Sequence, residues 1–387
     1  MPVNPAHSQP VQAVIVQLCL ARYRVPFYAA LSRLMEGRLA VIAGPYSYGG
    51  SPRSVEDTTE FTQIRTRNIF VLNRLALQTL PRMVWSCPIV VLEFDLRILS
   101  NLALFAVRRG RNLPVILWGH GLSRRSNSPT WVAHIRKWMA HHAAAAVFYD
   151  DRGREDFIRF GVSKEKLFVA HNSVDIAYAL SVDPLSNTNR QKILFIGRLI
   201  RGKKVDLLVE GFARSLPGLP DTTQLVVVGD GPERDYLHAL ARERGVAERI
   251  HFAGEVTDDV ELASLFAQSI LCVSPGPIGL AAIHSLAHGV PLLVADAEPH
   301  GPEVEVLLPY VTGEFFASND ADALACRLVE LLANPQRLAL LGHNGRDLVQ
   351  SKYSVQQMAA VFLQAFNYVG ATCSGGLSGN GRNGGIR

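Results

Sequence analysis

The sequence contains no uncharged apolar run of about 18 residues, the length that a membrane-spanning helix needs. Its best candidate, residues 84–107, is interrupted by Glu93, Asp95 and Arg97. The first residues, MPVNPAHSQP, have neither the basic start nor the apolar core of a secretion signal. The five cysteines are scattered, and no two of them form a CxxC pair. These absences argue against a membrane-spanning or disulfide-bonded protein and against a zinc site, and they predict reduced cysteines in the cytoplasm.

The length of the chain and its uneven charge set the outline of the protein. At 387 residues it is longer than one hydrophobic core usually supports, so two domains are expected. The net charge of +5 is concentrated early: residues 1–185 hold 22 basic and 13 acidic residues, against 17 and 21 in residues 186–387. A basic first half is typical either of a solvated surface or of contact with an anionic acceptor or membrane surface. Nucleic acid is not an expected partner, because no basic run is interleaved with aromatic residues.

Short apolar runs alternate with helical stretches, the pattern of parallel βαβ units. In the first half the predicted strands are 11–19, 39–44, 88–94, 113–118, 143–149 and 166–172, and the predicted helices are 27–36, 97–110, 128–141 and 151–160. A polar segment at 183–191 predicts a linker. The pattern restarts with strands at 192–197, 224–229, 249–254, 270–274 and 291–296, and with helices at 204–215, 232–245, 259–268, 279–288, 320–333, 335–350 and 354–368.

These elements predict an α/β protein of two doubly wound domains, 1–185 and 186–350. A helix at 351–370 is expected to return toward the N-terminal domain. The Gly/Ser/Asn-rich residues 371–387 predict a disordered tail.

Two loops of the second domain have the residues expected for phosphate binding. Gly197-Arg198-Leu199 and Lys203 follow the strand at 192–197, where a parallel sheet opens onto its ligand, and an arginine and a lysine placed there can hold a diphosphate. Residues 274–280 lie between a strand and a helix, where small residues and a helix N-terminus favour a bound anion. Taken singly, each has a structural explanation, as surface charges or a tight turn, and so has Gly229-Asp230-Gly231.

In combination these segments resemble a known family. GRL followed by lysine, VVVGDGP, IHFAGEV, LCVSP–GL and HGVPLLVA, between Ile193 and Phe316, are similar to the donor-binding half of family 4 glycosyltransferases, and SPGPIGLAAIHSLAHGVP is similar to a bacterial surface-polysaccharide subgroup. A weaker resemblance runs through HGLSRR (120–125) and FGVSKEKLFVAHNSVD (160–175). It implies the GT-B fold, two Rossmann-like domains facing a central cleft, with the first domain on the acceptor side and the second on the nucleotide-sugar donor side. The implied reaction moves a sugar from a nucleotide-diphosphate sugar to an acceptor with retention of configuration, in bacterial polysaccharide or glycolipid biosynthesis.

The resemblance also implies roles for residues. Arg198 and Lys203 would bind the donor diphosphate and stabilise it as the leaving group, supported by the backbone of the loop at 276–280. The turn at 229–232 and the strand at 252–256 are expected near the nucleotide. The implied donor-binding residues are Gly197, Arg198, Lys203, Gly229, Asp230, Gly231, Gly276, Pro277, Gly279, Leu280, His284 and Glu303.

The acidic motif of the family is missing. Family members usually carry two glutamates separated by seven residues, and the matching positions here hold Gly276 and His284. His284 can take the second glutamate's place at the ribose hydroxyls, because imidazole both donates and accepts hydrogen bonds, whereas Gly276 offers the donor sugar only backbone. We interpret this as a variant site. The alternative is a structural histidine in a degenerate protein.

The first domain contributes fewer candidates. His120 follows the predicted strand at 113–118, and the resemblance implies contact with the donor sugar or help at the reacting centre; a satisfied loop histidine is the alternative. Where the family often has a glycine pair near its first strand, this chain has Arg22, Tyr23 and Arg24, a weak acceptor-side candidate whose arginines could meet a phosphate. Glu303 matches a glutamate that follows the donor loop, with a helix-start role as the alternative.

Without an obvious enzyme nucleophile, we predict same-face displacement: the diphosphate leaves toward Arg198 and Lys203, and one of its oxygens accepts the acceptor's proton. This scheme needs neither a metal nor a further cofactor. The expected partners are a nucleotide-sugar donor and a saccharide or lipid-linked acceptor. The stretch 97–111, apolar residues edged by arginines, is either an interfacial helix on an anionic membrane, at the inner face of the cytoplasmic membrane, or a buried helix with a basic end.

Three other functions are compatible with parts of the sequence. A non-catalytic nucleotide-sugar-binding partner would explain the missing glutamates. A GT-B-fold sugar-nucleotide epimerase would turn over the donor without an acceptor. A nicotinamide oxidoreductase is disfavoured, because no GxGxxG follows the first strand of either domain.

Overall fold

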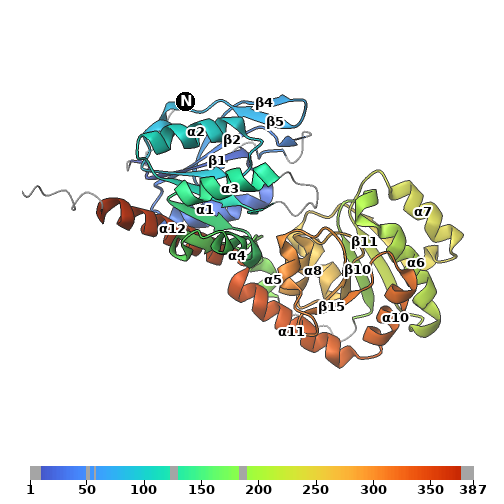
Figure 1. Ribbon diagram of the computed structural model, residues 1–387. Coiled ribbons are helices and arrows are strands. Elements are labelled where there is room, and N and C mark those ends of the chain that lie inside the picture. The colour runs from blue at the N-terminus through green and yellow to red at the C-terminus, as the bar shows by residue number, and fades with distance from the viewer. Residues whose placement is uncertain (1–9, 49–52, 56–57, 123–129, 183–189, 376–387) are drawn as a thin grey trace, which may run out of the picture. The chain divides into compact units, whose positions relative to one another are not determined.

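A computed structural model describes residues 10–48, 53–55, 58–122, 130–182 and 190–375 (Figure 1). The chain divides into two compact units: one holds the residues up to His171 and those from Val355 onward, and the other is Asn172–Ser354. The sequence predicted the first boundary later, between 185 and 186, and the second boundary earlier, between 350 and 351. The first differs because Val174, Ile176 and Ala179 pack in the core of the second unit. Residues 183–189 of the predicted linker lie outside the described residues.

The N-terminal unit is built on a parallel sheet with the strand order β3-β2-β1-β6-β7-β8-β9. The strands are β1 (Ala13–Cys19), β2 (Leu39–Gly44), β3 (Thr62–Arg65), β6 (Ile89–Glu93), β7 (Val115–Gly119), β8 (Ala145–Phe148) and β9 (Leu167–Val169). Its longer helices are α1 (Val25–Leu34), α2 (Leu99–Gly110), α3 (Thr130–His142), α4 (Asp151–Arg159) and α12 (Val355–Gly375). The strand order reverses between β1 and β6, as in doubly wound domains.

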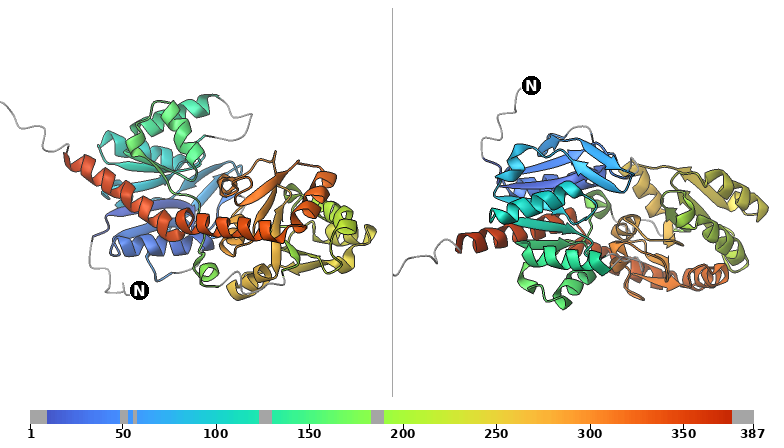
Figure 2. Two further views of the ribbon diagram at one scale, coloured as in Figure 1. Left: turned by 90° about the horizontal axis from the view of Figure 1, so that it is seen from below. Right: turned by 45° about the horizontal axis from the view of Figure 1, so that its top comes forward.

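Helices cover both faces of this sheet, which is why its central strands are mostly apolar. Along β1, Ala13 and Ile15 pack in a core with α1 and α12, whereas Val14 and Val16 pack in a second core with α2, α3 and α4. The two views of Figure 2 show α12 running along the N-terminal unit. The sequence-derived alternation of strands and helices is thus confirmed here.

The C-terminal helix α12 is held by aromatic packing on the N-terminal unit. Phe362 lies against Phe27 of α1 and Trp118 of β7, with ring centroids 5.0 and 4.9 Å apart. The helix continues through residues 371–375, where the sequence predicted a disordered tail. Residues 376–387 of that tail lie outside the described residues.

The C-terminal unit has a parallel sheet with the strand order β12-β11-β10-β13-β14-β15. The strands are β10 (Lys192–Ile196), β11 (Gln224–Val228), β12 (Ile250–Gly254), β13 (Ser269–Ser274), β14 (Leu292–Ala295) and β15 (Gly313–Phe316). The helices include α5 (Ala177–Ser181), α6 (Val205–Ser215), α7 (Arg234–Glu243), α8 (Asp259–Ala267), α9 (Ala281–Ala287), α10 (Ala321–Leu332) and α11 (Pro335–Lys352). Ile193 and Phe195 of β10 face one core and Leu194 faces the other, so this domain is also doubly wound.

Four short strands were not predicted from the sequence. They are β3 and β15, at sheet edges, and β4 (Asn68–Val71) and β5 (Leu75–Gln78), which pair as an antiparallel hairpin. Each is only four residues long, too short for an alternating pattern to stand out.

The segment 97–111, which the sequence left as interfacial or buried, contains α2 and packs in the core through Leu104 and Phe105. The guanidinium of Arg108 is fully buried and donates hydrogen bonds to the backbone carbonyls of Val84 and Pro114 at 2.7 and 2.9 Å. The structure therefore favours the buried helix. None of the helices that the structure describes has both the length and the apolar character needed to cross a membrane.

Candidate functional site

The loops after β10, β11 and β13 converge at the carboxyl end of the C-terminal sheet. Because β10 lies between β11 and β13, the loops at 197–204 and 275–280 flank the point where the strand order reverses. Open α/β sheets bind ligands at such a point. The two segments predicted to bind phosphate are therefore neighbours in the fold.

Glycines let the loop after β11 pack against the loop after β10. Gly229 and Gly231 have φ angles of 133° and 157°, and a Cβ on either would overlap a backbone carbonyl, that of Gly197 or of Leu199. The N–H of Leu199 donates to the carbonyl of Asp230 at 2.9 Å. The GRL and GDG segments thus form one packed unit whose geometry requires these glycines.

Gly276 brings the third loop into the same cluster. A Cβ at this position would lie 2.7 Å from the carbonyl oxygen of Gly202 and 2.9 Å from that of Lys203. These are backbone atoms, which cannot rotate away. The position therefore has no space for the glutamate that the family usually carries, and the glycine lets the loop at 275–280 contact the backbone of Gly202 and Lys203.

Lys203 ties the loops together and supplies positive charge. Its Nζ donates a hydrogen bond to the carbonyl oxygen of Pro277 at 2.5 Å. Burial and the neighbouring charge of Arg198 lower the pKa of the Lys203 ammonium, with an opposite effect from Glu303. Arg198 itself is exposed. Two cations close enough to repel each other are stabilised by an anion bound beside both.

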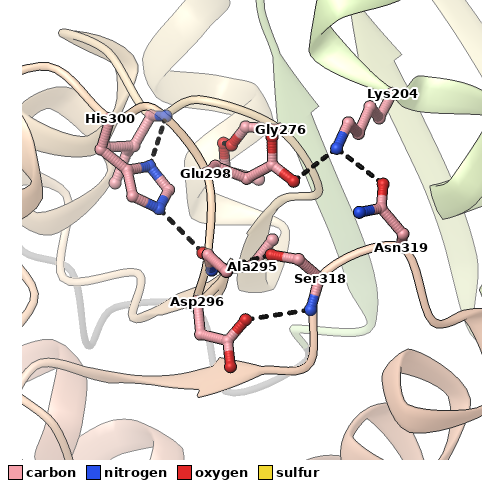
Figure 3. A network of polar contacts seen from close by, with 11 residues as sticks. Lys204, Gly276, Ala295, Asp296, Glu298, His300, Ser318 and Asn319 are labelled. Carbon is pink, nitrogen blue, oxygen red and sulfur yellow. Dashed lines mark hydrogen bonds and ion pairs between the residues drawn. The ribbon is translucent and has the colours of Figure 1, made fainter. Parts of the chain in front are cut away.

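Lys204, the next residue in the sequence, has side-chain hydrogen-bond partners that differ from those of Lys203. It adopts a left-handed conformation with φ of 54°, and its Nζ donates to Glu298 at 2.5 Å and to Asn319 at 2.7 Å (Figure 3). The Glu298 side chain is only 4% exposed. Lys204 therefore joins the start of α6 to the loops after β14 and β15. The sequence alone predicted a role for Lys203 and none for Lys204.

His300 is a further part of the site that the sequence analysis missed. Its Nδ1 lies 3.2 Å from the backbone nitrogen of Ile278, whose N–H donates to it, and its Nε2 lies 2.9 Å from the carbonyl oxygen of Ala295 (Figure 3). Accepting at Nδ1 and donating at Nε2 defines a neutral imidazole. His300 so connects the loop after β13 to the end of β14. Its only sequence signal was its position just after a predicted strand.

The predicted residues His284 and Glu303 lie on the elements that follow these loops. His284 is on α9, and burial lowers the pKa of its imidazole despite the opposing effect of Asp259 and Asp175. A neutral ring can both donate and accept, as the predicted ribose contact requires. Glu303 is buried, and its carboxylate accepts a hydrogen bond from the side-chain amide of Asn172. Gly279 and Leu280 immediately precede α9.

The remaining candidates belong to the N-terminal unit. His120 follows β7 and is exposed, with its ring centroid 4.7 Å from that of Tyr149. Arg22 and Tyr23 are exposed on a short 3-10 helix. Arg124 and Arg125, which belong to the HGLSRR segment, lie outside the described residues.

Arg24 differs from its neighbours because it is only 5% exposed. Its guanidinium carbon lies 5.0 Å from the ring centroid of Trp118 and 5.1 Å from that of Tyr149. These cation–π contacts give Arg24 a structural role in the packing of the N-terminal unit. Of the acceptor-side candidates, only Arg22 and Tyr23 are open to a ligand.

Comparison with known proteins adds to this geometry. Residues 179–348 match a family of glycosyl transferases, group 1. The matched segment lies inside the C-terminal unit and includes every predicted donor-binding residue. A relative, the lipopolysaccharide core biosynthesis glycosyltransferase LpsE of Rhizobium meliloti, is 28% identical over 172 residues, which are 44% of this chain and 48% of that protein. The match thus spans about half the length of this curated relative.

Solved structures resemble almost the whole chain. A glycosyltransferase from Rickettsia africae has a TM-score of 0.70 at 16% identity, covering 93% of this chain and 98% of its own. Anabaena HepE, in complex with UDP, has a TM-score of 0.65 at 16% identity, covering 94% of this chain and 100% of its own. These likenesses establish the fold. It is GT-B, as the sequence predicted.

Proposed function

We propose that the protein is a glycosyltransferase that moves a sugar from a nucleotide-diphosphate sugar to a saccharide or lipid-linked acceptor. The observation that carries this proposal is the convergence of Arg198 and Lys203 with the Gly276–Leu280 loop at the reversal point of the C-terminal sheet. A group 1 match over the same residues supports it. The bound UDP of HepE makes a uridine nucleotide the first donor to test.

The proposed chemistry is retaining displacement on one face of the sugar. The bond between the anomeric carbon and the diphosphate oxygen breaks, and a bond from the anomeric carbon to the acceptor oxygen forms on the same face. The acceptor's proton passes to an oxygen of the departing diphosphate. Arg198 and Lys203 stabilise the charge that develops there, and His120 contacts the donor sugar. This scheme uses no cofactor besides the donor.

The proposed setting is assembly of a bacterial polysaccharide or glycolipid in the cytoplasm. The relative LpsE is named for lipopolysaccharide core biosynthesis, which supports a saccharide acceptor. The four cysteines that the structure describes, Cys19, Cys87, Cys272 and Cys326, are all free thiols, which fits a reducing compartment.

The absence of carboxylates at positions 276 and 284 favours a second candidate, a non-catalytic nucleotide-sugar-binding protein. Turnover separates the candidates. Purified protein is incubated with UDP-, GDP- and dTDP-sugars, with and without saccharide and lipid-linked acceptors, and both the released nucleoside diphosphate and the identity of the remaining nucleotide sugar are determined. A transferase releases it in an acceptor-dependent way and yields a glycosylated product. Donor turnover without an acceptor would indicate an epimerase or hydrolase, and binding without turnover a binding protein.

A further inference from the structure

The hairpin β4–β5 of the N-terminal unit has two unlike faces. Its register pairs Asn68 with Gln78 and Phe70 with Ala76 on one face, and this face is attached to the domain. The side-chain amides of Asn68 and Gln78 donate to the carbonyls of Leu18 and Gln17, at 2.6 and 2.8 Å. Hydrogen bonds to the end of β1 therefore fix the orientation of the hairpin (Figure 1).

The other face is aliphatic and exposed. The same register places Ile69 opposite Leu77 and Val71 opposite Leu75. These four side chains are between 37% and 55% exposed, and Leu72 at the tip is 87% exposed. A soluble edge hairpin usually places polar side chains outward, so five neighbouring aliphatic side chains here mark a contact surface.

The turn itself shows that Leu72 does not serve local folding. Leu72 and Asn73 both have positive φ, 52° and 51°, and the N–H of Arg74 donates to the carbonyl of Val71 at 3.0 Å. Positive φ at both positions favours asparagine or glycine, and a leucine with positive φ is strained. The strained position holds the most exposed aliphatic side chain of the hairpin, which suggests a role outside the turn.

The sequence segment that contains the hairpin carries charge of one sign. From Phe61 to Leu92 the chain has four arginines, Arg65, Arg67, Arg74 and Arg82, and no aspartate or glutamate. Arg67 and Arg74 are exposed beside the aliphatic face. A symmetric contact between two copies of this hairpin would bring like charges together, whereas an anionic lipid surface would meet both its apolar and its basic side chains.

We propose that the β4–β5 hairpin docks the protein on a bilayer of anionic lipids, with Leu72, Ile69 and Leu77 entering the interface and Arg67 and Arg74 contacting headgroup phosphates. This replaces the segment 97–111, whose apolar face is buried, as the basis for membrane association. It does not rest on the proposed transfer, because binding to vesicles requires neither donor nor acceptor.

The test is co-sedimentation of the full chain with vesicles of phosphatidylcholine alone or mixed with phosphatidylglycerol, at low and high salt. The wild type is expected to sediment with the phosphatidylglycerol vesicles and to be released by salt. Leu72→Asn should lower the vesicle-bound partition coefficient about fivefold or more, from lost apolar burial. Arg74→Gln should lower it by about fivefold in anionic vesicles only.

Leu72→Asn also separates docking from folding. Asparagine accepts positive φ more easily than leucine, so the thermal midpoint of this variant should be unchanged or higher. Ile69→Thr, which keeps the β-branched shape, is the second variant. Leu340→Asn is the matched control, since Leu340 is 59% exposed on α11 of the other unit, and it should bind vesicles like the wild type.

Three outcomes would overturn the proposal. One is a wild type that stays in the supernatant with anionic vesicles at low salt, and another is unchanged binding of both Leu72→Asn and Ile69→Thr. The third is a concentration-dependent dimer that Leu72→Asn abolishes in the absence of vesicle binding, which would assign the surface to a second copy.

Discussion

The backbone N–H of Ile278 donates a hydrogen bond to Nδ1 of His300, at 3.2 Å, while the other ring nitrogen lies 2.9 Å from the carbonyl oxygen of Ala295. One imidazole thus holds the loop after β13 in place from the end of β14. Ile278 lies within the small-residue loop proposed to contact the donor diphosphate, between Pro277 and Gly279. If this loop contacts the donor as proposed, His300 is a positioning residue.

Replacing His300 by alanine should weaken donor binding without removing it. Two hydrogen bonds are lost, each contributing about 1 kcal/mol, so the Kd of the donor should rise by up to about thirtyfold. His343→Ala, at an exposed position on α11, is the control. Calorimetry measures both Kd values, and an unchanged Kd in the His300 variant would show that the loop holds its conformation alone.

Gly276 and Gly279 should respond differently to the same small change. A Cβ at Gly276 meets backbone oxygens at 2.7 and 2.9 Å, whereas the atom nearest to one at Gly279 is Nζ of Lys203, 3.9 Å away. Gly276→Ala should lower the free energy of unfolding by about 1–3 kcal/mol and impair donor binding. Gly279→Ala should change stability by less than about 0.5 kcal/mol. Urea unfolding compares them, and equal effects would refute the close approach of the loops.

Donor affinity should fall at alkaline pH through Lys203. Its pKa is lowered by burial and by Arg198, so the ammonium loses its proton at a lower pH than an ordinary lysine does. Below that pKa the charge is present and the donor Kd should be constant, and above it the Kd should rise. Lys203→Arg should remove this rise, because a guanidinium stays protonated. Titration of the nucleotide affects both proteins equally, so identical pH profiles would exclude Lys203 as the titrating group.

Glu93 should make the N-terminal unit less stable as pH rises. Burial, together with Asp95, raises the pKa of its carboxyl from 4.5 to about 8. The folded state therefore holds this proton more tightly than the unfolded state, so stability falls between roughly pH 4.5 and pH 8. Glu93→Gln should be more stable than the wild type above pH 8 by about 1–3 kcal/mol, with a smaller difference at pH 5. Thermal unfolding of both proteins at both pH values measures this stability difference. A difference that does not change with pH would contradict the raised pKa of Glu93.

The periodicity of apolar residues in the sequence predicted most of the strands and helices. The buried strands of both sheets, such as β1 and β10, are mostly apolar and flanked by turn residues, and the glycines of GRL, GDG and PGPIGL follow strands of the second sheet. The loops proposed to bind phosphate were found from these residues together with the family resemblance of their order. Their mutual packing, which excludes a side chain at Gly276, was not predictable, because it depends on distances between segments more than seventy residues apart.

Long-range polar contacts explain the other omissions. Lys203 and Lys204 are adjacent, and the sequence predicted a role for Lys203 alone; the Nζ of Lys203 donates to the Pro277 carbonyl, whereas that of Lys204 donates to Glu298 and Asn319. Arg24 was grouped with Arg22, although its guanidinium is buried among aromatic rings. In each case a residue distant in the sequence determines where the charged side chain lies, so the local sequence pattern could not predict its position.

The central claim is that Arg198 and Lys203 bind the diphosphate of the donor. The most direct test is calorimetric binding of UDP-, GDP- and dTDP-sugars to the wild type, Arg198→Ala and Lys203→Ala. Lys192→Ala is the control, because Lys192 lies at the opposite end of the same strand and its Nζ bonds Gln268 at 2.7 Å. We predict that each site variant weakens binding of one donor by about tenfold or more, while the control binds like the wild type. Unchanged affinity in both site variants would contradict the account.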